Sequence, residues 1–316
     1  MYPRVWRSSI TGSYYKQNHP STYEAAVITP TDIQDIEAVT ILDEVLGRAR
    51  PAYKLRPICR PIRMDNLTAR IDVATSLTGQ EKVPPMVEAE VASESYTAVE
   101  FDLWKNVVHV VISDEAAKKA AHDILSMNIN DAARDIARME NKQIAETAET
   151  CTEKVSGVVY SDWGAMTTPP NNDTNPFQAI QASIEYIEGK GYEPDFMALN
   201  PSLWGKFVTN SYVKDLVHTG IATVGNEGGQ FTLPGYPTIK VFTDSHLTQT
   251  PSATKGPVIG DSKSSTLVLG QGPTEAAQYR NEKAGYNAYI IRQYMDPKLV
   301  IQDAIDKIST CLNQSR

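Results

Sequence analysis

The sequence predicts an α+β protein, and three features lead to this class. An alternating strand pattern at residues 101–112 runs directly into a helical pattern that continues to residue 150. Residues 60–101 form a polar excursion with strand-like alternation on both sides of a turn-rich tip. From Pro176 onward helices and strands follow one another, and strands return near the C-terminus.

The composition is that of a folded protein. The chain has 316 residues, of which 41% are hydrophobic and 22% charged, enough for two domains or one large irregular one. No apolar run approaches the about 20 residues of a membrane helix, and the N-terminus lacks the apolar core of a secretory signal. Cys59, Cys151 and Cys311 are far apart, so we expect neither a disulfide framework nor a metal cluster. A reducing cytoplasm is the simplest environment for such a chain.

Residues 1–29 are polar and aromatic and show no helical or strand period. A solvated tail would not usually carry so many aromatic side chains, among them Trp6, Tyr14 and Tyr15. We interpret this segment as an extended arm whose aromatic residues dock on another subunit, and the alternative is a partly disordered terminus. A short amphipathic helix is expected to follow at residues 31–48.

The charge is unevenly distributed along the chain. The formal net charge of −8 argues against a dedicated nucleic-acid binder. A stretch without acidic residues nevertheless gathers six basic ones: Arg48, Arg50, Lys54, Arg56, Arg60 and Arg63. We expect this stretch to pair with acidic surface on a neighbouring subunit, because the rest of the chain is strongly acidic. Contact with nucleic acid is the alternative.

The excursion at residues 60–101 has the pattern of a long two-stranded hairpin that begins at Arg60. Lys82 lies in its turn-rich tip. Glu88 and Glu90 fall on one side of the returning strand, as on a solvated face. Since an isolated hairpin is only marginally stable in water, we expect this one to lie on a surface outside its own domain.

The longest predicted element is a helix from residue 114 to residue 150. Ser113 is a suitable N-cap, and Asp114 and Glu115 follow at the positive end of the helix dipole. Its apolar face repeats at a spacing of three to four residues: Leu125, Ile129, Ala132, Ile136, Met139 and Ile144. A helix of about 36 residues spans roughly 54 Å, which suits a wide, thin subunit better than an enzyme domain. A coiled-coil arm or a helical bundle is the alternative.

The second half of the chain alternates helices and strands. Pro176 opens a helix that ends near Gly189, and a buried strand is expected just before Asn200. Asn200 then caps a short helix with Pro201 at its first position. Further strand signals occur at residues 237–243, 256–261, 265–270 and 286–296, with a last strand or turn near 304–308.

A glycine-rich stretch at residues 220–230 contains Gly225 and Glu227. It lacks the Gly-Lys-Ser/Thr ending of a phosphate loop, and the order of its glycines fits neither nucleotide-binding fingerprint. We expect a flexible loop at a subunit contact.

No catalytic constellation is recognisable in the sequence. Neither a GxSxG elbow nor an HExxH motif is present, and the histidines are isolated from one another. The stretch Asp244-Ser245-His246 is favoured as a polar turn, because the members of a catalytic triad meet through the fold rather than by adjacency. We therefore expect a protein that is not an enzyme and that uses no cofactor or metal.

The order of these parts resembles the major capsid proteins of tailed double-stranded DNA viruses, which have the Hong Kong 97-like fold. Each motif is weak alone, and the order over nearly the whole chain carries the resemblance. The residues that carry it are 107–116 at the entry to the long helix, Asn200-Pro-Ser-Leu-Trp, 233–241, Pro257-Val-Ile-Gly-Asp and 288–296.

The resemblance implies a division of the chain into the parts of that fold. Residues 1–59 would be an N-terminal arm with a short helix, and residues 60–105 an extended loop that lies over the adjacent subunit. Residues 106–173 and 262–316 would form the peripheral domain around a spine helix at 114–150. Residues 174–261 would form the axial domain, which points to the centre of each hexamer or pentamer.

The implied function is self-assembly as hexamers and pentamers into an icosahedral shell that encloses double-stranded DNA. The implied location is the virion, after assembly in the host cytoplasm, with no membrane involved. Its partners would be other copies of the chain, the packaged DNA, a portal and, in some systems, scaffold or decoration proteins. The residues expected at contacts between subunits are Trp6, Tyr14, Tyr15, Arg56, Arg60, Arg63, Lys82, Glu88, Glu90, Gly225 and Glu227.

Two features of some family members are of interest here. Because the arm reaches its helix by about residue 30, we expect any scaffold to be a separate protein or to be unnecessary. Some members also crosslink a loop lysine to a neighbour's asparagine. Lys82 and either Asn281 or Asn287 have the required residue types, but nothing in the sequence places a catalytic acid beside them.

Two other readings stay open. The first is an encapsulin, a cellular compartment that uses the same fold to enclose a cargo enzyme; encapsulins typically have a cargo-binding helix where this chain has an extended aromatic segment. The second is an α+β enzyme or binding module with a helical arm, which would show a pocket with converging polar groups.

Overall fold

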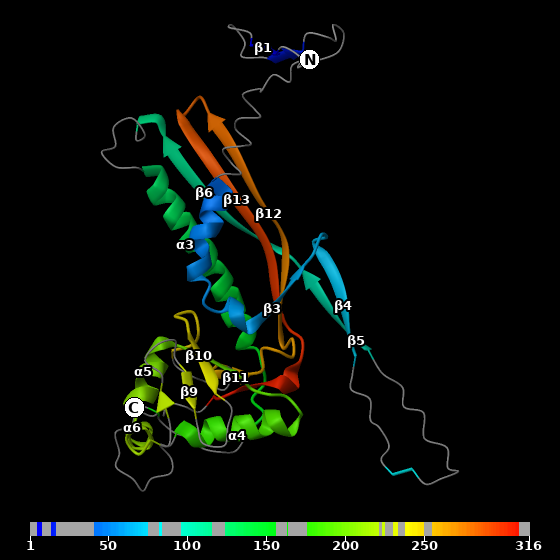
Figure 1. The fold of residues 1–316 in the computed structure, drawn as a ribbon, viewed down its shortest axis with the longest axis vertical. Helices are drawn as coiled ribbons and strands as arrows, with labels where there is room; N and C mark the ends of the chain where they lie inside the picture. Colours follow the sequence, from blue (N-terminus) through cyan, green and yellow to red (C-terminus); the bar gives the residue numbers. More distant parts are fainter. Residues whose placement is uncertain are drawn as a thin grey trace.

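The computed structural model describes residues 5–7, 14–16, 41–74, 82–83, 96–115, 124–155, 163, 176–220, 223–224, 230–232, 238–249 and 255–309. In this part of the chain, two sheets lie at the two ends of an elongated body, with a long helix beside one of them (Figure 1). A two-stranded hairpin projects from the side of the body (Figure 1).

The first sheet has four strands in the order β3-β12-β13-β6. They are β3 (Cys59–Arg63), β12 (Leu267–Asn281), β13 (Tyr286–Leu299) and β6 (Trp104–Ser113). β12 and β13 form a long antiparallel hairpin with a register shift between Gln271 and Thr274. β6 pairs antiparallel with β13, and β3 pairs parallel with β12.

Helix α3 (Ile124–Ala148) has 25 residues and lies along one face of this sheet (Figure 1). Its buried side chains, such as Ile129, Ile136 and Ile144, follow the predicted apolar stripe. The predicted long helix is confirmed over residues 124–148. Residues 114–115 are also helical, and residues 116–123 lie outside the described ones.

The predicted continuous strand at 101–112 is wrong, because the chain breaks at Leu103. β5 (Tyr96–Asp102) ends before this residue, and β6 begins after it. The backbone N–H of Leu103 donates to the carbonyl of Leu67, and the buried Leu103 side chain packs with Phe101. This local bond and packing take the chain from the hairpin into the four-stranded sheet.

The predicted hairpin is confirmed as β4 (Thr68–Ala74) and β5, paired antiparallel from Thr68↔Asp102 to Ala74↔Tyr96. It does not begin at Arg60, as expected. Residues 59–63 instead form β3 and pair with β12, because the buried Cys59 packs in the core with Leu267 and Leu269. Residues 75–81 and 84–95 lie outside the described part of the chain.

The N-terminal segment, which was expected to be an extended arm, contains two short strands. β1 (Val5–Arg7) and β2 (Tyr14–Lys16) pair antiparallel, with Trp6 opposite Tyr15. The helix predicted at 31–48 is confirmed for residues 41–49, where Val45 and Ala49 are buried against α3, while residues 31–40 are not described. Two short 3₁₀ turns follow, η1 (Arg50–Ala52) and η2 (Arg56–Ile58).

The second sheet has six strands in the order β14-β11-β7-β10-β9-β8. They are β14 (Ile305–Lys307), β11 (Val258–Gly260), β7 (Phe196–Leu199), β10 (Ile239–Thr243), β9 (Gln230–Thr232) and β8 (Thr223–Val224). β14, which lies within the strand or turn predicted near 304–308, pairs antiparallel with β11 and so joins this sheet. The strands β8 and β9 were not predicted.

Three helices accompany this sheet: α4 (Pro176–Gly189), α5 (Pro201–Thr209) and α6 (Ser211–His218). α4 matches the prediction, and α6 was not predicted. The Asn200 side chain caps α5 by accepting from the Ser202 N–H at 3.0 Å, as predicted. The same side chain donates to the Leu247 carbonyl at 2.7 Å, so the cap also holds the turn after β10.

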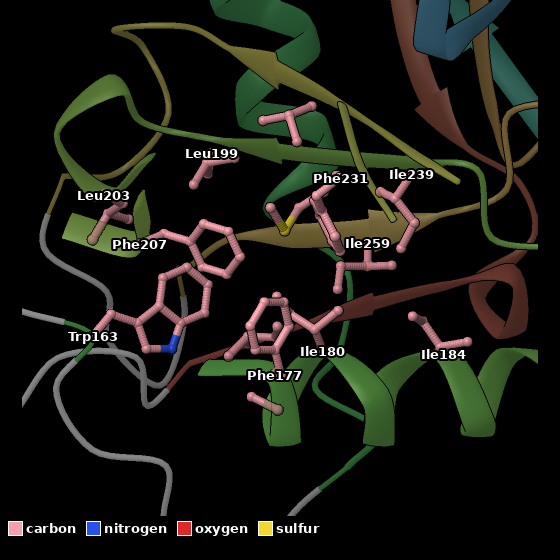
Figure 2. Close-up of a cluster of buried hydrophobic side chains, with 14 of the residues drawn as sticks. Trp163, Phe177, Ile180, Ile184, Leu199, Leu203, Phe207, Phe231, Ile239 and Ile259 are labelled. Carbon is pink, nitrogen blue, oxygen red and sulfur yellow. The ribbon is translucent and has the colours of Figure 1, made fainter. Parts of the chain in front are cut away.

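The core of this region is an aromatic cluster around Phe207 (Figure 2). The ring centroids of Trp163, Phe177 and Phe231 lie 5.5–5.7 Å from that of Phe207. Trp163 is only 1% exposed. The cluster fixes the helices on the sheet and so gives this part of the chain its own core.

Candidate inter-subunit surfaces

The described residues offer little catalytic machinery. Within these ranges no three His, Cys, Asp or Glu side chains come together in a way that could hold a metal ion. The Asp244-Ser245-His246 stretch forms a turn, as expected, in which the Asp244 carboxylate lies 2.6 Å from His246 Nδ1. None of the described helices is long and apolar enough to cross a membrane.

Arg56 was expected at a subunit contact, but the structure gives it a partner in its own chain. Its Nε and Nη2 donate to the two carboxylate oxygens of Glu140 at 2.6 Å each. Gln293 Nε2 also donates to Glu140, at 3.2 Å, and the guanidinium lies 3.9 Å from the centroid of the Tyr53 ring. This network joins the segment before β3 to α3 and β13.

The other two arginines predicted at subunit contacts, Arg60 and Arg63, lie on β3. Arg60 is exposed and donates to the Ser265 hydroxyl at 2.7 Å. Arg63 is exposed and lines a hollow together with Arg50. Neither Arg50, Arg60 nor Arg63 forms an ion pair with a described residue. These charges stay available for another molecule.

The remaining predicted contact residues are only partly described. Lys82 is exposed, with a left-handed backbone φ of 55°. For Trp6, Tyr14 and Tyr15 the structure gives the backbone pairing of β1 with β2. Four others fall outside the described residues: Glu88, Glu90, Gly225 and Glu227. Their place at subunit contacts stays a prediction.

Two exposed aromatic residues were missed by the sequence analysis. Trp104 is 70% exposed at the start of β6 and borders a pocket of about 290 Å³ beside Gln143 and Thr147 of α3. Tyr96 is 64% exposed at the outer end of the hairpin. Large exposed aromatic side chains are enriched where proteins meet one another. Leu103 and Trp104 are adjacent apolar residues that interrupt the alternation, and this is the sequence signal that could have drawn attention to Trp104.

The four-stranded sheet also has an open face. On β6, Val108 and Val110 turn toward α3, so Val107 and Val111 point to the opposite side and are 40% and 47% exposed. Tyr279 of β12 is 38% exposed, and its hydroxyl lies 3.1 Å from Nε2 of His109. Scattered apolar side chains are normal on a surface, but here they share one sheet face.

Comparison with known proteins places the fold. No protein-family model matches the chain, and no curated protein matches its sequence. Among solved structures, the mature capsid of bacteriophage PhiM1 is similar with a TM-score of 0.60 and 11% identity, over 83% of this chain and 87% of that one. A virus-like particle from Pyrococcus furiosus is similar with a TM-score of 0.55 and 9% identity, over 85% and 98% of the two chains.

The SrpI encapsulin from Synechococcus elongatus PCC 7942 is similar to the same degree. Its TM-score is 0.55 at 10% identity, over 84% of this chain and 91% of that one. These likenesses confirm the predicted α+β fold. At such low identities they concern the fold alone.

Proposed function

We propose, from the premise that this chain has the Hong Kong 97-like fold, that it is the major capsid protein of a tailed virus. Copies of the chain would assemble as hexamers and pentamers into an icosahedral shell that encloses double-stranded DNA. The observation that carries this proposal is the likeness to the PhiM1 capsid over most of both chains. The shell would be the functional unit, so the chain would act through its surfaces rather than through an active site.

The architecture supports this role in physical terms. A closed shell requires many moderate contacts that repeat by symmetry between identical subunits. The β4–β5 hairpin reaches beyond the body of the subunit and would supply contact area over a neighbour (Figure 1). α3 would act as the spine that keeps the subunit stiff, because it is packed along β6 and β13.

We further propose the domain assignment that the resemblance implies. Residues 106–173 and 262–316 would form the peripheral domain, and residues 174–261 the axial domain. The pairing of β14 with β11 adds a second link between the two, because the C-terminal strand joins the sheet of the axial part. The contact residues would include the exposed Arg60, Arg63 and Lys82, with Trp104 added.

Electron microscopy of the chain expressed alone, with light scattering beside it, tests the proposal. Closed polyhedral particles, or rings of five and six subunits, are the expected result. A monomer or dimer that persists at high protein concentration, and also after addition of a crowding agent, would contradict it. Particles that contain double-stranded DNA after infection would support the viral role, together with a portal and any scaffold or decoration protein.

The second candidate is an encapsulin shell, which the likeness to the SrpI encapsulin favours. The paired strands β1 and β2 near the N-terminus support the viral reading, because encapsulins typically begin with a cargo-binding helix. The contents of purified particles separate the two: one co-purifying enzyme would indicate the encapsulin, and nucleic acid the capsid. In either case the virion or the compartment, not a membrane, would be the location.

A further inference from the structure

A hollow of about 250 Å³ lies between the segment after the helix at 41–49 and the irregular part of β12. The residues that matter for its chemistry are Arg50, Tyr53, Arg56, Arg63, Thr274 and Gln293. Three guanidinium groups thus border one small space. Because like charges repel, such a cluster is normally stabilised by anions.

Among the described residues, only one of these three charges has an acidic partner. Arg56 forms its bidentate pair with Glu140. Arg50 and Arg63 have no ion pair with any described residue, and no carboxylate is among the residues that line the hollow. The charges facing the space therefore sum to a net positive value, which favours an anionic ligand. Arginine is also the side chain best shaped to hold oxyanions, through its fork of N–H donors.

Gln293 provides the second, independent observation. Its side chain is buried, with only 6% of the residue exposed, and its Nε2 donates to Glu140 at 3.2 Å. This bond fixes the orientation of the amide, because the opposite orientation would set an oxygen against the carboxylate. Gln293 Oε1 is then a buried acceptor without a hydrogen-bond partner among the described residues. A buried acceptor of this kind requires a donor.

Tyr53 adds a polar atom of the opposite kind. Burial, followed by the nearby Glu140 carboxylate, raises the pKa of Tyr53 to about 12, so the phenol stays protonated and can donate. Arg56 and Gln293 lie close enough to lower that pKa in part, yet the hydroxyl forms no bond of normal geometry with the described chain. The residues that line the hollow thus carry guanidinium and phenol donors and one amide acceptor.

We propose that this hollow is a binding site for a monohydrogen phosphate group. The phosphate oxygens would accept from Arg50, Arg63 and Tyr53. The remaining P–OH would donate to Gln293 Oε1, which no fully deprotonated oxyanion such as sulfate can do. The ligand would be free inorganic phosphate, because the terminal phosphate ester of a nucleic acid loses its second proton near a pH of about 6 and then carries no P–OH. This inference goes beyond shell assembly, and it stands on the geometry of one subunit.

The bound phosphate would connect separate parts of the chain. Arg50 and Tyr53 belong to the segment around η1, whereas Arg63 lies on β3 and Gln293 on β13. A ligand that binds only the folded chain stabilises it in proportion to its occupancy. We therefore expect phosphate to stabilise the N-terminal segment against the four-stranded sheet.

Isothermal titration calorimetry of the full chain with inorganic phosphate at pH 7.5 tests the proposal. Sulfate at matched ionic strength is the comparison anion. Arg63→Gln and Arg50→Gln are expected to weaken phosphate binding by about tenfold or more, as for the loss of a charge-assisted pair. Arg60→Gln is the matched control, because Arg60 lies on the same strand but outside the hollow. This control should bind phosphate as the wild-type chain does.

A 5′-phosphorylated oligonucleotide and its unphosphorylated twin form the second arm. Binding of free phosphate, with weaker binding of the phosphorylated oligonucleotide, supports the site. Four results would overturn it: no binding in either arm, binding of the phosphorylated oligonucleotide alone, equal binding of sulfate, or an equal loss in Arg60→Gln. The titration reports on the site whether or not the chain assembles, so its failure is separate from failure of the proposed function.

Discussion

Replacing Arg56 by methionine tests whether the buried Glu140 carboxylate depends on this one partner. Glu140 has a side-chain exposure of 0%, whereas Arg56 is 33% exposed. Arg56→Met keeps an unbranched apolar side chain but leaves the carboxylate with Gln293 Nε2 as its remaining side-chain donor among the described residues. Glu140→Gln removes the negative charge that pairs with the Arg56 guanidinium, but water can still reach this guanidinium. The two halves of the pair should therefore differ in cost.

The expected magnitudes follow from this asymmetry. Removing the partner of a buried charge costs about 3–5 kcal/mol of unfolding free energy, so we expect about 3–4 kcal/mol for Arg56→Met. For Glu140→Gln we expect about 1–2 kcal/mol, because solvent reaches Arg56 and one neutral hydrogen bond replaces a charged one. The double variant should cost less than the sum of the two single changes, because it removes both charges and leaves no unpaired buried charge behind.

Urea unfolding followed by tryptophan fluorescence measures these costs at one protein concentration and one assembly state. Arg60→Met is the control, because this exposed arginine should change the free energy of unfolding by no more than about 0.5 kcal/mol. Equal costs for Arg56→Met and Glu140→Gln, or additive costs in the double variant, would refute the reasoning.

Three further predictions concern other parts of the molecule. Trp104→Ala should leave the unfolding free energy within about 0.5 kcal/mol but weaken assembly at least tenfold by light scattering, as for the loss of an interface anchor; unchanged assembly would count against this surface. Phe207→Ala should cost about 3–5 kcal/mol in urea unfolding, because it removes the centre of a buried aromatic cluster, and a cost below about 1 kcal/mol would contradict that packing. Burial raises the pKa of the Asp306 carboxyl, so the folded chain holds this proton more tightly than the unfolded chain and stability rises as the pH falls toward that pKa. Asn at position 306 is always neutral, so Asp306→Asn should melt at a higher temperature than the wild type at pH 8. Its free energy of unfolding should be higher by about 1.4 kcal/mol per unit by which the pKa of Asp306 is raised, and this advantage should disappear toward pH 4. A pH-independent difference in calorimetry would show that Asp306 does not act through its charge.

Local patterns predicted most of the regular elements. The helix-capping signal at Asn200, the apolar stripe of α3 and the turn-bounded alternation of β4 and β5 all depend on residues close in sequence. Their order along the chain was enough to indicate the fold, because neighbouring elements are usually joined by short connections. The interface residues were predicted from charge and aromatic content, and all of them stay predictions.

What local patterns could not predict are the pairings between distant segments. β12 extends to Asn281 through residues with weak strand signals, because β13 holds it by hydrogen bonds. Residues 59–63 have a strand pattern that fits a hairpin equally well, and only the packing of Cys59 with the β12 region assigns them to the larger sheet.

The same division applies to function. The sequence by itself determined the type and order of the elements, because helix and strand periods are properties of neighbouring residues. Only the tertiary structure decided that Arg56 pairs with Glu140, and that Arg50 and Arg63 border a hollow with Gln293. Such sites join residues far apart along the chain, and their chemistry depends on burial, which is a property of the folded subunit.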